Sequence, residues 1–259
     1  MESTDFKTDT YTTPARELSA LTRLLPSFAF YSRFVFIVLS AARAAKHGPY
    51  PRTRWGADSQ AVLNLMERVG GRFEISGFDN IRRLGRSCVI VANHMSTLET
   101  TAFPFLFLPF GDVAFVVKQS LCDYPVFGHV MRAVDPIAVT RTKPREDLKL
   151  VLEKGTEMLQ SGRSVIIFPQ TTRSLTFDPA EFNTIGVKLA LKAGAPIIPV
   201  AIKTDFWGHG SMLKDFGKMD PSKTIHMAIG EPMTITGRGN EEHQRALEFI
   251  TSKLKSWEG

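Results

Sequence analysis

The chain has 259 residues, 43% of them hydrophobic, and a formal net charge of +6, which suits one large domain with an ample apolar core. Its two cysteines, Cys88 and Cys122, are too few for a disulfide scaffold or a metal cluster and fit a reducing compartment. The sequence contains no Gly-x-Ser-x-Gly, Gly-x-Gly-x-x-Gly or P-loop pattern, so a serine-hydrolase elbow, a dinucleotide fold and a P-loop nucleotide site are not indicated.

The positive charge is concentrated near the N-terminus. Residues 11–55 contain seven Arg or Lys residues and one acid, Glu17, whereas residues 1–10 contribute −2 and the rest of the chain only +2. The same segment holds the most apolar stretch of the chain, residues 28–45, which is interrupted by two arginines. Because this charge lies on an apolar, aromatic segment and not on a stripe of basic and stacking residues, a nucleic-acid-binding surface is not favoured.

The N-terminal residues are predicted to form a tail followed by two helices. Residues 1–13 are polar and predicted to be disordered, and the helices are expected at residues 14–25 and 27–46, separated by Pro26. The apolar stretch is too short and too interrupted for a spanning helix, which needs about 20 apolar residues, and begins too late for an ordinary secretory signal. We therefore interpret residues 14–55 as a basic segment that docks on an anionic membrane surface. The alternative is a core helix whose arginines reach out to solvent.

Residues 56–259 are predicted to form one α/β domain. Helical periodicity covers residues 58–69 and stops at a glycine pair, and a short strand follows at residues 73–75. Strands and helices then alternate, which predicts a mostly parallel central sheet flanked by helices. The further predicted strands are 88–92, 113–117, 136–140, 164–168, 196–203 and 224–229, and the further predicted helices are 96–108, 145–160, 184–192 and 240–257.

His94 follows the β-branched strand at residues 88–92, at the carboxyl end where open α/β sheets place their ligands. Glu99 comes five residues later and can turn back to hold the imidazole, which would put a general base and the group that orients it in one loop. His226 and His243 are also followed by Glu after five residues. His226 lies inside a predicted strand and His243 on a charged helical face, so we interpret both as structural.

Cationic residues follow three further strand ends, in the order Lys118, Arg141 and Arg173. Arg173 belongs to a polar loop with the sequence Phe168-Pro169-Gln170-Thr171-Thr172-Arg173-Ser174. Taken alone, each cation is better explained as a solvated side chain than as a binding residue. Because the carboxyl ends of parallel strands meet at one edge of a sheet, however, one base and three cations would share a rim. This pattern predicts a site that binds an anionic substrate and deprotonates its hydroxyl group.

These segments, in this order, resemble the motif blocks of the glycerolipid acyltransferases, the family of the 1-acylglycerol-3-phosphate acyltransferases. The four matching blocks are Asn93-His94 with Glu99; Lys118, Pro125, Gly128 and Arg141; residues 168–174; and Ile197-Ile198-Pro199-Val200. The resemblance spans about residues 73–231. Four blocks in the family's order are far more specific than any one of them.

The chain departs from the family pattern at two places. Glu99 stands where the family has Asp, which keeps the charge and adds one methylene group. Gln170 and Thr171 stand where the third block has Glu-Gly, which removes a carboxylate beside Arg173. We expect Arg173 to be less neutralised as a result and freer to bind an anion. This second departure also leaves the acceptor headgroup open.

The resemblance implies an enzyme that moves a fatty acyl group from an acyl thioester to the hydroxyl of a lysophospholipid in phospholipid biosynthesis. The most direct acceptor is 1-acylglycerol-3-phosphate, which gives phosphatidate. In this reaction His94 would act as the general base, and Glu99 would fix its tautomer and orientation. The thioester is already activated, so an enzyme nucleophile is not required.

The resemblance also implies roles for the remaining polar residues of the rim. Arg173 and Lys118, with Arg141 as a weaker third, are expected to bind the acceptor phosphate. Gln170, Thr171 and Thr172 are expected to line the headgroup pocket. Neither a metal nor a cofactor is expected, and acyl-CoA or acyl carrier protein serves as co-substrate. The enzyme is expected to be a peripheral or monotopic protein on the cytoplasmic face of the membrane.

Three alternatives stay open. The acceptor could be different, such as glycerol-3-phosphate, another lysophospholipid or a lyso-aminolipid, which the changed third block motivates. The chain could be a noncatalytic lipid-binding homologue, although His94 and a carboxylate are both present. It could also be a hydrolase or a CoA-independent transacylase, in which His94 activates water or another lipid.

Overall fold

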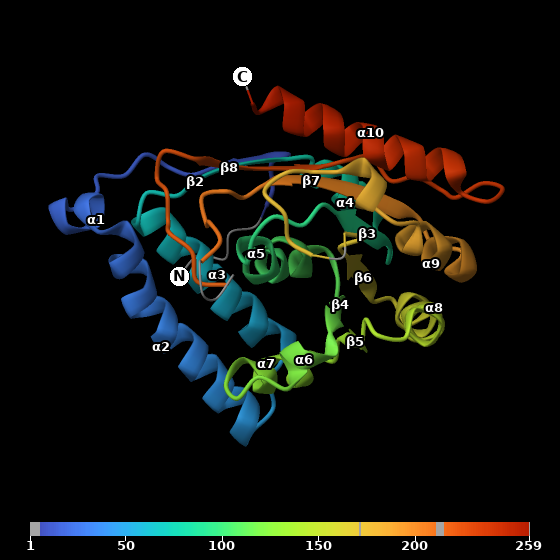
Figure 1. Cartoon of the computed structure of the whole chain (residues 1–259), viewed down its shortest axis with the longest axis horizontal. Helices are drawn as coiled ribbons and strands as arrows, with labels where there is room; N and C mark the ends of the chain where they lie inside the picture. The colour runs from blue at the N-terminus through green and yellow to red at the C-terminus, as the bar shows by residue number, and fades with distance from the viewer. Residues whose placement is uncertain (1–5, 171, 211–214, 259) are drawn as a thin grey trace.

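An eight-stranded mixed sheet runs through the protein, which we describe from a computed structural model for residues 6–170, 172–210 and 215–258 (Figure 1). The order of strands across the sheet is β1-β2-β8-β7-β3-β6-β4-β5. The strands are β1 (Thr10–Thr12), β2 (Arg72–Ser76), β3 (Val89–Ala92), β4 (Val113–Lys118), β5 (Ile137–Val139), β6 (Ser164–Ile167), β7 (Ile197–Lys203) and β8 (Thr224–Ile229).

Five neighbouring strands, β7, β3, β6, β4 and β5, run parallel to one another. The β8 strand is antiparallel to β7, β2 is parallel to β8, and β1 is antiparallel to β2. The predicted α/β fold with a mostly parallel sheet flanked by helices is therefore confirmed. The direction of β8 was not predicted, because a short apolar run has the same pattern whichever way the strand runs.

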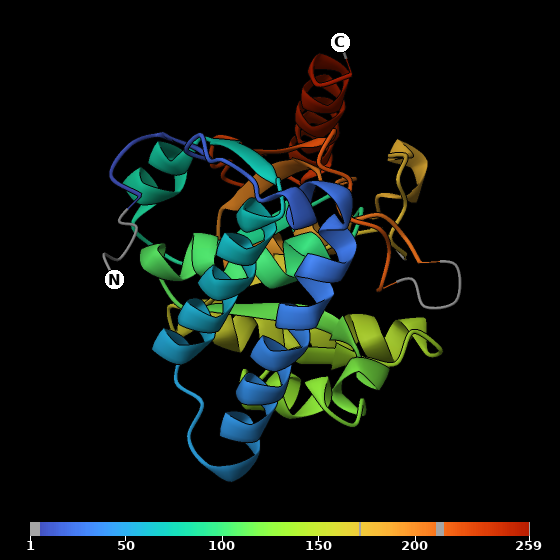
Figure 2. The ribbon, with the colours of Figure 1, turned by 90° about the vertical axis from the view of Figure 1, so that its left-hand side faces the viewer.

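Helices cover both faces of the sheet (Figures 1 and 2). On one face lie α2 (Pro26–His47), α3 (Arg52–Arg68) and α5 (Leu98–Phe107), and on the other lie α8 (Pro144–Gln160), α9 (Ile185–Ala193) and α10 (Asn240–Ser256). Because successive strand residues point to opposite faces, Ile90 packs in the first core and Val89 and Val91 in the second. The shorter helices are α1 (Ala20–Leu24), α4 (Phe78–Leu84), α6 (Gln119–Cys122) and α7 (Phe127–Ala133).

The N-terminal tail is ordered wherever the structure describes it, so the prediction of a disordered segment is wrong for residues 6–13; residues 1–5 lie outside the described part. The β1 strand pairs with β2, and the buried ring of Phe6 stacks on Phe78 with centroids 4.3 Å apart. Two side chains of this tail also bond to the core. The hydroxyls of Tyr11 and Thr13 donate to the buried carboxylate of Glu67.

Two helix boundaries also differ from the predictions. Only Ala20–Leu24 is helical in the segment expected to form the first helix, and α2 begins at Pro26, a position where the missing N–H costs nothing. The α3 helix begins at Arg52, directly after Pro51, and so includes residues interpreted as part of the docking segment. Hydrophobic periodicity begins only later in α3, because its first turns carry polar residues.

The α2 helix has one face in the core and one face in solvent. Phe30 and Phe34 are buried, whereas Phe28 and Phe36 are 65% and 72% exposed. With 22 residues and a mean hydropathy of 1.4 in its most apolar window, α2 could cross a membrane by length and composition, which corrects the expectation that this stretch is too short and too interrupted. A core helix or a signal sequence passes the same test, but only 28% of that window is buried inside the protein.

The parallel strands bring the four predicted residues to one edge of the sheet. His94 follows β3, Arg173 follows β6, Lys118 ends β4 and Arg141 follows β5, and these four strands are consecutive neighbours. Their carboxyl ends therefore point to a common rim, as the alternation of strands and helices predicted.

Candidate active site

The loop that carries His94 is fixed to the sheet by the residue before it. The Asn93 side chain is fully buried and continues the ladder between β3 and β7: its Nδ2 donates to the Ile202 carbonyl at 2.8 Å, and its Oδ1 accepts from the Ile202 N–H at 2.9 Å. The side-chain amide thus bonds to both backbone groups of Ile202, as the backbone of a neighbouring strand would. The chain can therefore turn away from the sheet at His94 without leaving a buried polar group unpaired.

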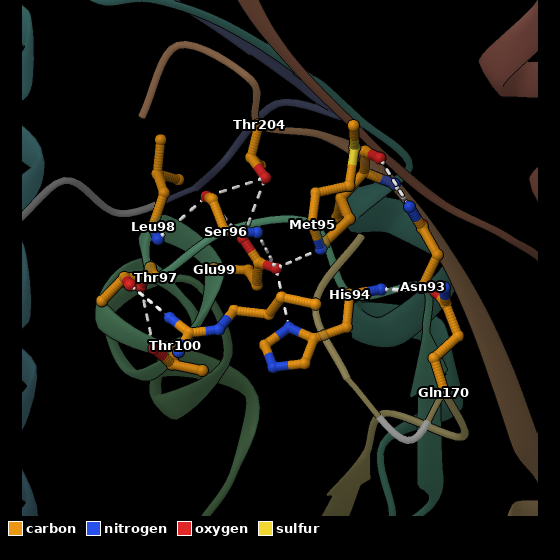
Figure 3. A network of polar contacts seen from close by, with 12 residues as sticks. Asn93, His94, Met95, Ser96, Thr97, Leu98, Glu99, Thr100, Gln170 and Thr204 are labelled. Atoms are coloured by element: carbon orange, nitrogen blue, oxygen red, sulfur yellow. Dashed lines mark hydrogen bonds and ion pairs between the residues drawn. The ribbon is translucent and has the colours of Figure 1, made fainter. Parts of the chain in front are cut away.

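Glu99 turns back on this loop and holds the imidazole, as predicted (Figure 3). Nδ1 of His94 lies 2.8 Å from Oε1 of Glu99, and the same oxygen accepts from the backbone N–H groups of Met95 and Ser96 at 2.7 and 2.8 Å. The other oxygen, Oε2, accepts from the hydroxyls of Ser96 and Thr204 at 3.0 and 2.9 Å. Five donors thus surround a carboxylate that is fully buried.

This arrangement keeps the carboxylate ionised. Burial alone would raise the pKa of Glu99, but the hydrogen bond and the charge of His94, together with the backbone donors of the loop, outweigh it and hold that pKa below its ordinary value. An ionised carboxylate only accepts hydrogen bonds, so His94 carries its proton on Nδ1. Nε2 is then the nitrogen with a free lone pair, which is what a general base requires.

The loop after β6 packs against His94 on two sides. The ring of Phe168 stacks on the imidazole with centroids 4.2 Å apart and planes at 16°. Oε1 of Gln170 accepts from the His94 N–H at 2.8 Å, and the Ser174 N–H donates to the His94 carbonyl at 3.0 Å. The first and third motif blocks therefore form one unit, in which the third block fixes the backbone and the ring of the base.

Gln170 does not lie where the sequence predicted. Its side chain is 2% exposed and bonds to the backbone behind His94, so it cannot line an open headgroup pocket. Thr171 lies outside the described residues, and Thr172 is exposed, as a pocket residue would be. The sequence of this loop does not distinguish side chains that turn inward from side chains that face solvent.

Arg173 has an acidic partner, which corrects the prediction that loss of the third-block carboxylate leaves it less neutralised. Nη1 of Arg173 forms an ion pair with Oδ1 of Asp215, from the segment between β7 and β8. The same nitrogen donates to the hydroxyl of Thr97, which in turn donates to Asp215 at 3.2 Å. A carboxylate distant in sequence therefore neutralises Arg173.

Arg141 and Lys118 complete the cationic side of the rim. Burial lowers the pKa of Arg141, and the charge of Arg173 lowers it further, so the two guanidinium groups lie close enough to repel each other. Arg141 also adopts a left-handed backbone conformation with φ of 63°, and its N–H donates to Asp147 at 2.7 Å. The Lys118 side chain is exposed at the end of β4.

His226 and His243, the other histidines that Glu follows after five residues, have structural surroundings, as we interpreted. His226 lies on β8, stacks on Trp257 and has Nδ1 3.2 Å from Glu74, a residue of the neighbouring strand. His243 lies on α10 beside the ring of Phe182. Burial lowers the pKa of both imidazoles. Among the residues that the structure describes, no group of three or more His, Cys, Asp or Glu side chains is placed to hold a metal ion.

Three residues of the site were missed as functional in the sequence. Thr204 supports Glu99 and directly follows β7, so its position at a strand end on the same rim was an available signal. Phe168 was recognised as part of a motif, but its ring contact with His94 has no signature in the sequence. Asp215 lies outside the described helices and strands, and its pairing with Arg173 depends wholly on tertiary folding.

The chain is similar in sequence to known acyltransferases. The sequence model of a family described as Acyltransferase matches residues 72–203. The chain is 32% identical over 190 residues to the 1-acyl-sn-glycerol-3-phosphate acyltransferase of Pseudomonas aeruginosa, covering 73% of this chain and 68% of that one. It is 31% identical over 191 residues to an uncharacterised acyltransferase of Schizosaccharomyces pombe, covering 70% and 67%.

A solved structure shares the fold. The crystal structure of the 1-acyl-sn-glycerophosphate acyltransferase of Thermotoga maritima superposes with a TM-score of 0.65, covering 92% of this chain and 97% of that one. The two sequences are 20% identical in this comparison, so the likeness concerns the fold.

Proposed function

The chain belongs to the acyltransferase family and is an acyltransferase of lipid biosynthesis, and from this premise we propose that it acylates the hydroxyl of a lysophospholipid with an acyl thioester as donor. The most direct acceptor is 1-acylglycerol-3-phosphate, the acceptor that the names of several relatives state. The observation that carries this proposal is the 2.8 Å contact between His94 and the buried Glu99 at the rim of the sheet.

In the proposed reaction His94 is the general base. Nε2 takes the proton of the acceptor hydroxyl while its oxygen attacks the thioester carbonyl, a role that contributes roughly 10²–10⁴-fold to the rate. The tetrahedral intermediate collapses with cleavage of the carbon–sulfur bond, and the imidazolium returns the proton to the leaving thiolate. Glu99 stabilises the imidazolium between these steps without taking up its proton.

We place the acceptor phosphate at the cationic side of the rim. Arg141 and Arg173 repel each other across this site, and an anion between two guanidinium groups relieves that repulsion. Lys118, at the end of the neighbouring strand β4, supplies a third positive charge. The exposed Thr172 borders Arg173 and offers a hydroxyl to the headgroup.

We further propose that the exposed face of α2 docks on the membrane. The exposed apolar side chains at this end of the chain gather on α1 and α2 and comprise Leu24, Leu25, Phe28, Val35, Phe36 and Leu39. Arg23, Arg33 and Arg43 are exposed on the same helices, where they can meet anionic lipid headgroups. Such a surface would let an enzyme with an amphiphilic acceptor reach its substrate in the bilayer.

A different acceptor headgroup is the second candidate, and the ion pair between Arg173 and Asp215 favours it. A carboxylate beside the cationic rim lowers the positive charge that a phosphate meets. An acceptor with less negative charge than a phosphomonoester is therefore a specific alternative, in the same reaction and with the same base.

The decisive experiment measures release of free thiol from palmitoyl-CoA, with and without lysophosphatidate, by the parent chain, by His94→Ala and by the control His243→Ala. Release that requires lysophosphatidate, persists in the control and disappears in His94→Ala would support the proposal. Release without an acceptor would instead identify a thioesterase. Absence of release would direct the test to other acceptors and to acyl carrier protein as donor.

A further inference from the structure

One carboxylate outside the motif blocks joins two of them. Asp215 lies in the segment between β7 and β8, and its Oδ1 forms an ion pair with Nη1 of Arg173 in the third block. The same oxygen accepts from the hydroxyl of Thr97, in the loop between His94 and Glu99. Arg173, Thr97 and Asp215 thus form a closed triangle of contacts beside the base.

The backbone around Asp215 is anchored to α2 and not left to a free loop. The buried indole of Trp207 donates from Nε1 to the Asp215 carbonyl at 3.1 Å and packs edge-on against Phe30 at 4.9 Å. On the other side, the Tyr31 hydroxyl donates to the Gly217 carbonyl at 2.6 Å. A carboxylate held on both sides can orient its partner at little further entropic cost.

The third block cannot provide this carboxylate itself. Gln170 stands where the family pattern has Glu, and its amide oxygen is occupied by the His94 N–H. The guanidinium group of Arg141 lies close enough to that of Arg173 for the two to repel each other. Two guanidinium groups without Asp215 would carry +2, and with it the three side chains sum to +1.

We propose that Asp215 is a positioning and specificity residue of the headgroup site. It holds Arg173 through Nη1, so that Nη2 and Nε, which bond to none of the described residues, face an incoming anion in a fixed orientation. It also repels negative charge, and this repulsion grows with the charge of the acceptor. Two arginines alone would strongly prefer a dianionic phosphomonoester to a monoanionic phosphodiester. Asp215 makes this preference weaker.

This inference rests on the proposed function, and its test compares two acceptors that differ in charge. The full chain, Asp215→Asn and Asp215→Glu are assayed with palmitoyl-CoA and either lysophosphatidate or lysophosphatidylglycerol in mixed micelles. The matched control is Asp220→Asn, because Asp220 lies in the same segment and bonds to Ser222 instead of an arginine. Thermal unfolding of each variant checks that the fold is retained.

We expect Asp215→Asn to lower the KM for lysophosphatidate roughly tenfold and that for lysophosphatidylglycerol about threefold, because the lost repulsion scales with acceptor charge. Its kcat should fall severalfold for both acceptors, because Arg173 is no longer held. Asp215→Glu should restore the parent KM values, and Asp220→Asn should match the parent. A residue with a merely structural role would not lower KM while lowering kcat.

An unchanged or higher KM for lysophosphatidate in Asp215→Asn would overturn the inference, and so would equal changes for the two acceptors. Binding of both lysolipids measured without an acyl donor separates this result from a failure of the proposed function. If the parent transfers no acyl group, selectively tighter binding of lysophosphatidate by Asp215→Asn still supports the inference. Equal binding by parent and variant overturns it.

Discussion

The rim around His94 and the outer face of α2 break the usual distribution of polar and apolar groups in opposite ways. At the rim a carboxylate is fully buried, and five donors satisfy it. On α2 the rings of Phe28 and Phe36 are exposed on a helix whose other face packs in the core. Both arrangements cost stability in water, since buried charge loses hydration and exposed rings order solvent.

The difference between them lies in what resolves that cost. At the rim, loop N–H groups and hydroxyls of the chain itself compensate this cost, so the buried carboxylate needs no further partner. The cost at α2 is not met by any described part of the chain, which is why we propose that this surface docks on a membrane. An exposed apolar surface therefore indicates an interaction site, whereas a buried, hydrogen-bonded charge indicates a catalytic site.

The largest expected effect is on the rim and is chemical. Replacing His94 with Ala should lower kcat roughly 10²–10⁴-fold, because the acceptor hydroxyl loses its general base. Binding of the same variant to anionic vesicles should stay at the parent level, because α2 is unchanged. Steady-state kinetics and vesicle sedimentation on one preparation check both halves. A variant that lost vesicle binding as well would show that the two regions are not separable.

The next effect concerns α2 and the membrane. The substitution Phe36→Ser should weaken binding to phosphatidylglycerol vesicles roughly 10- to 100-fold, since burial of one such ring contributes about 1.5–3 kcal/mol. Turnover of a short-chain, water-soluble acceptor should not change. The control is Leu191→Ser, which removes an exposed apolar side chain from α9. Deletion of α2 is a poorer test, because Phe30 packs against Trp207 in the core.

A smaller effect concerns the buried charge and its dependence on pH. Glu99 has a folded-state pKa below its ordinary value of 4.5, so its contribution to stability is complete above that value and is lost as the pH falls through the folded pKa. Glu99→Gln should reduce the free energy of unfolding at neutral pH by about 1–3 kcal/mol. Urea unfolding at several acidic pH values should show the two proteins converging. A constant difference down to strong acid would contradict the assignment.

The smallest expected effect is at Thr204. Thr204→Val removes the hydroxyl that donates to Oε2 of Glu99 and should cost about 1 kcal/mol of stability, with a severalfold loss of kcat. Thr156→Val, which removes a hydroxyl that donates to the Leu152 carbonyl on α8, is the matched control. Equal kcat values for the two variants would show that the Thr204 hydroxyl does not support catalysis through Glu99.

Features that depend on residues near in sequence could be predicted. The strand before His94, the return of Glu99 and the shared rim of four strand ends follow from apolar runs and from the geometry of parallel strands. The extent of α2 was also close, because its proline start and apolar length are both visible. These features need only neighbouring residues to decide them.

Features that depend on distant partners could not be predicted in this way. The order in β1 follows from its pairing with β2 and from hydrogen bonds to Glu67, neither of which leaves a pattern near residue 10. The contact between Asp215 and Arg173 depends on the packing of the segment between β7 and β8 against α2. Gln170 could not be separated from its neighbours, because inward and outward side chains of an irregular loop have no period.

The amide of Gln170 has a consequence for how the enzyme meets acid. Its oxygen holds the backbone of the base, and an amide does not take up a proton in the range where a carboxylate would. This hydrogen bond is therefore kept in an acidification that would protonate a carboxylate at the same position. Lowering the pH therefore acts on the catalytic loop through the carboxylate of Glu99 and not through the hydrogen bond that joins the two motif blocks.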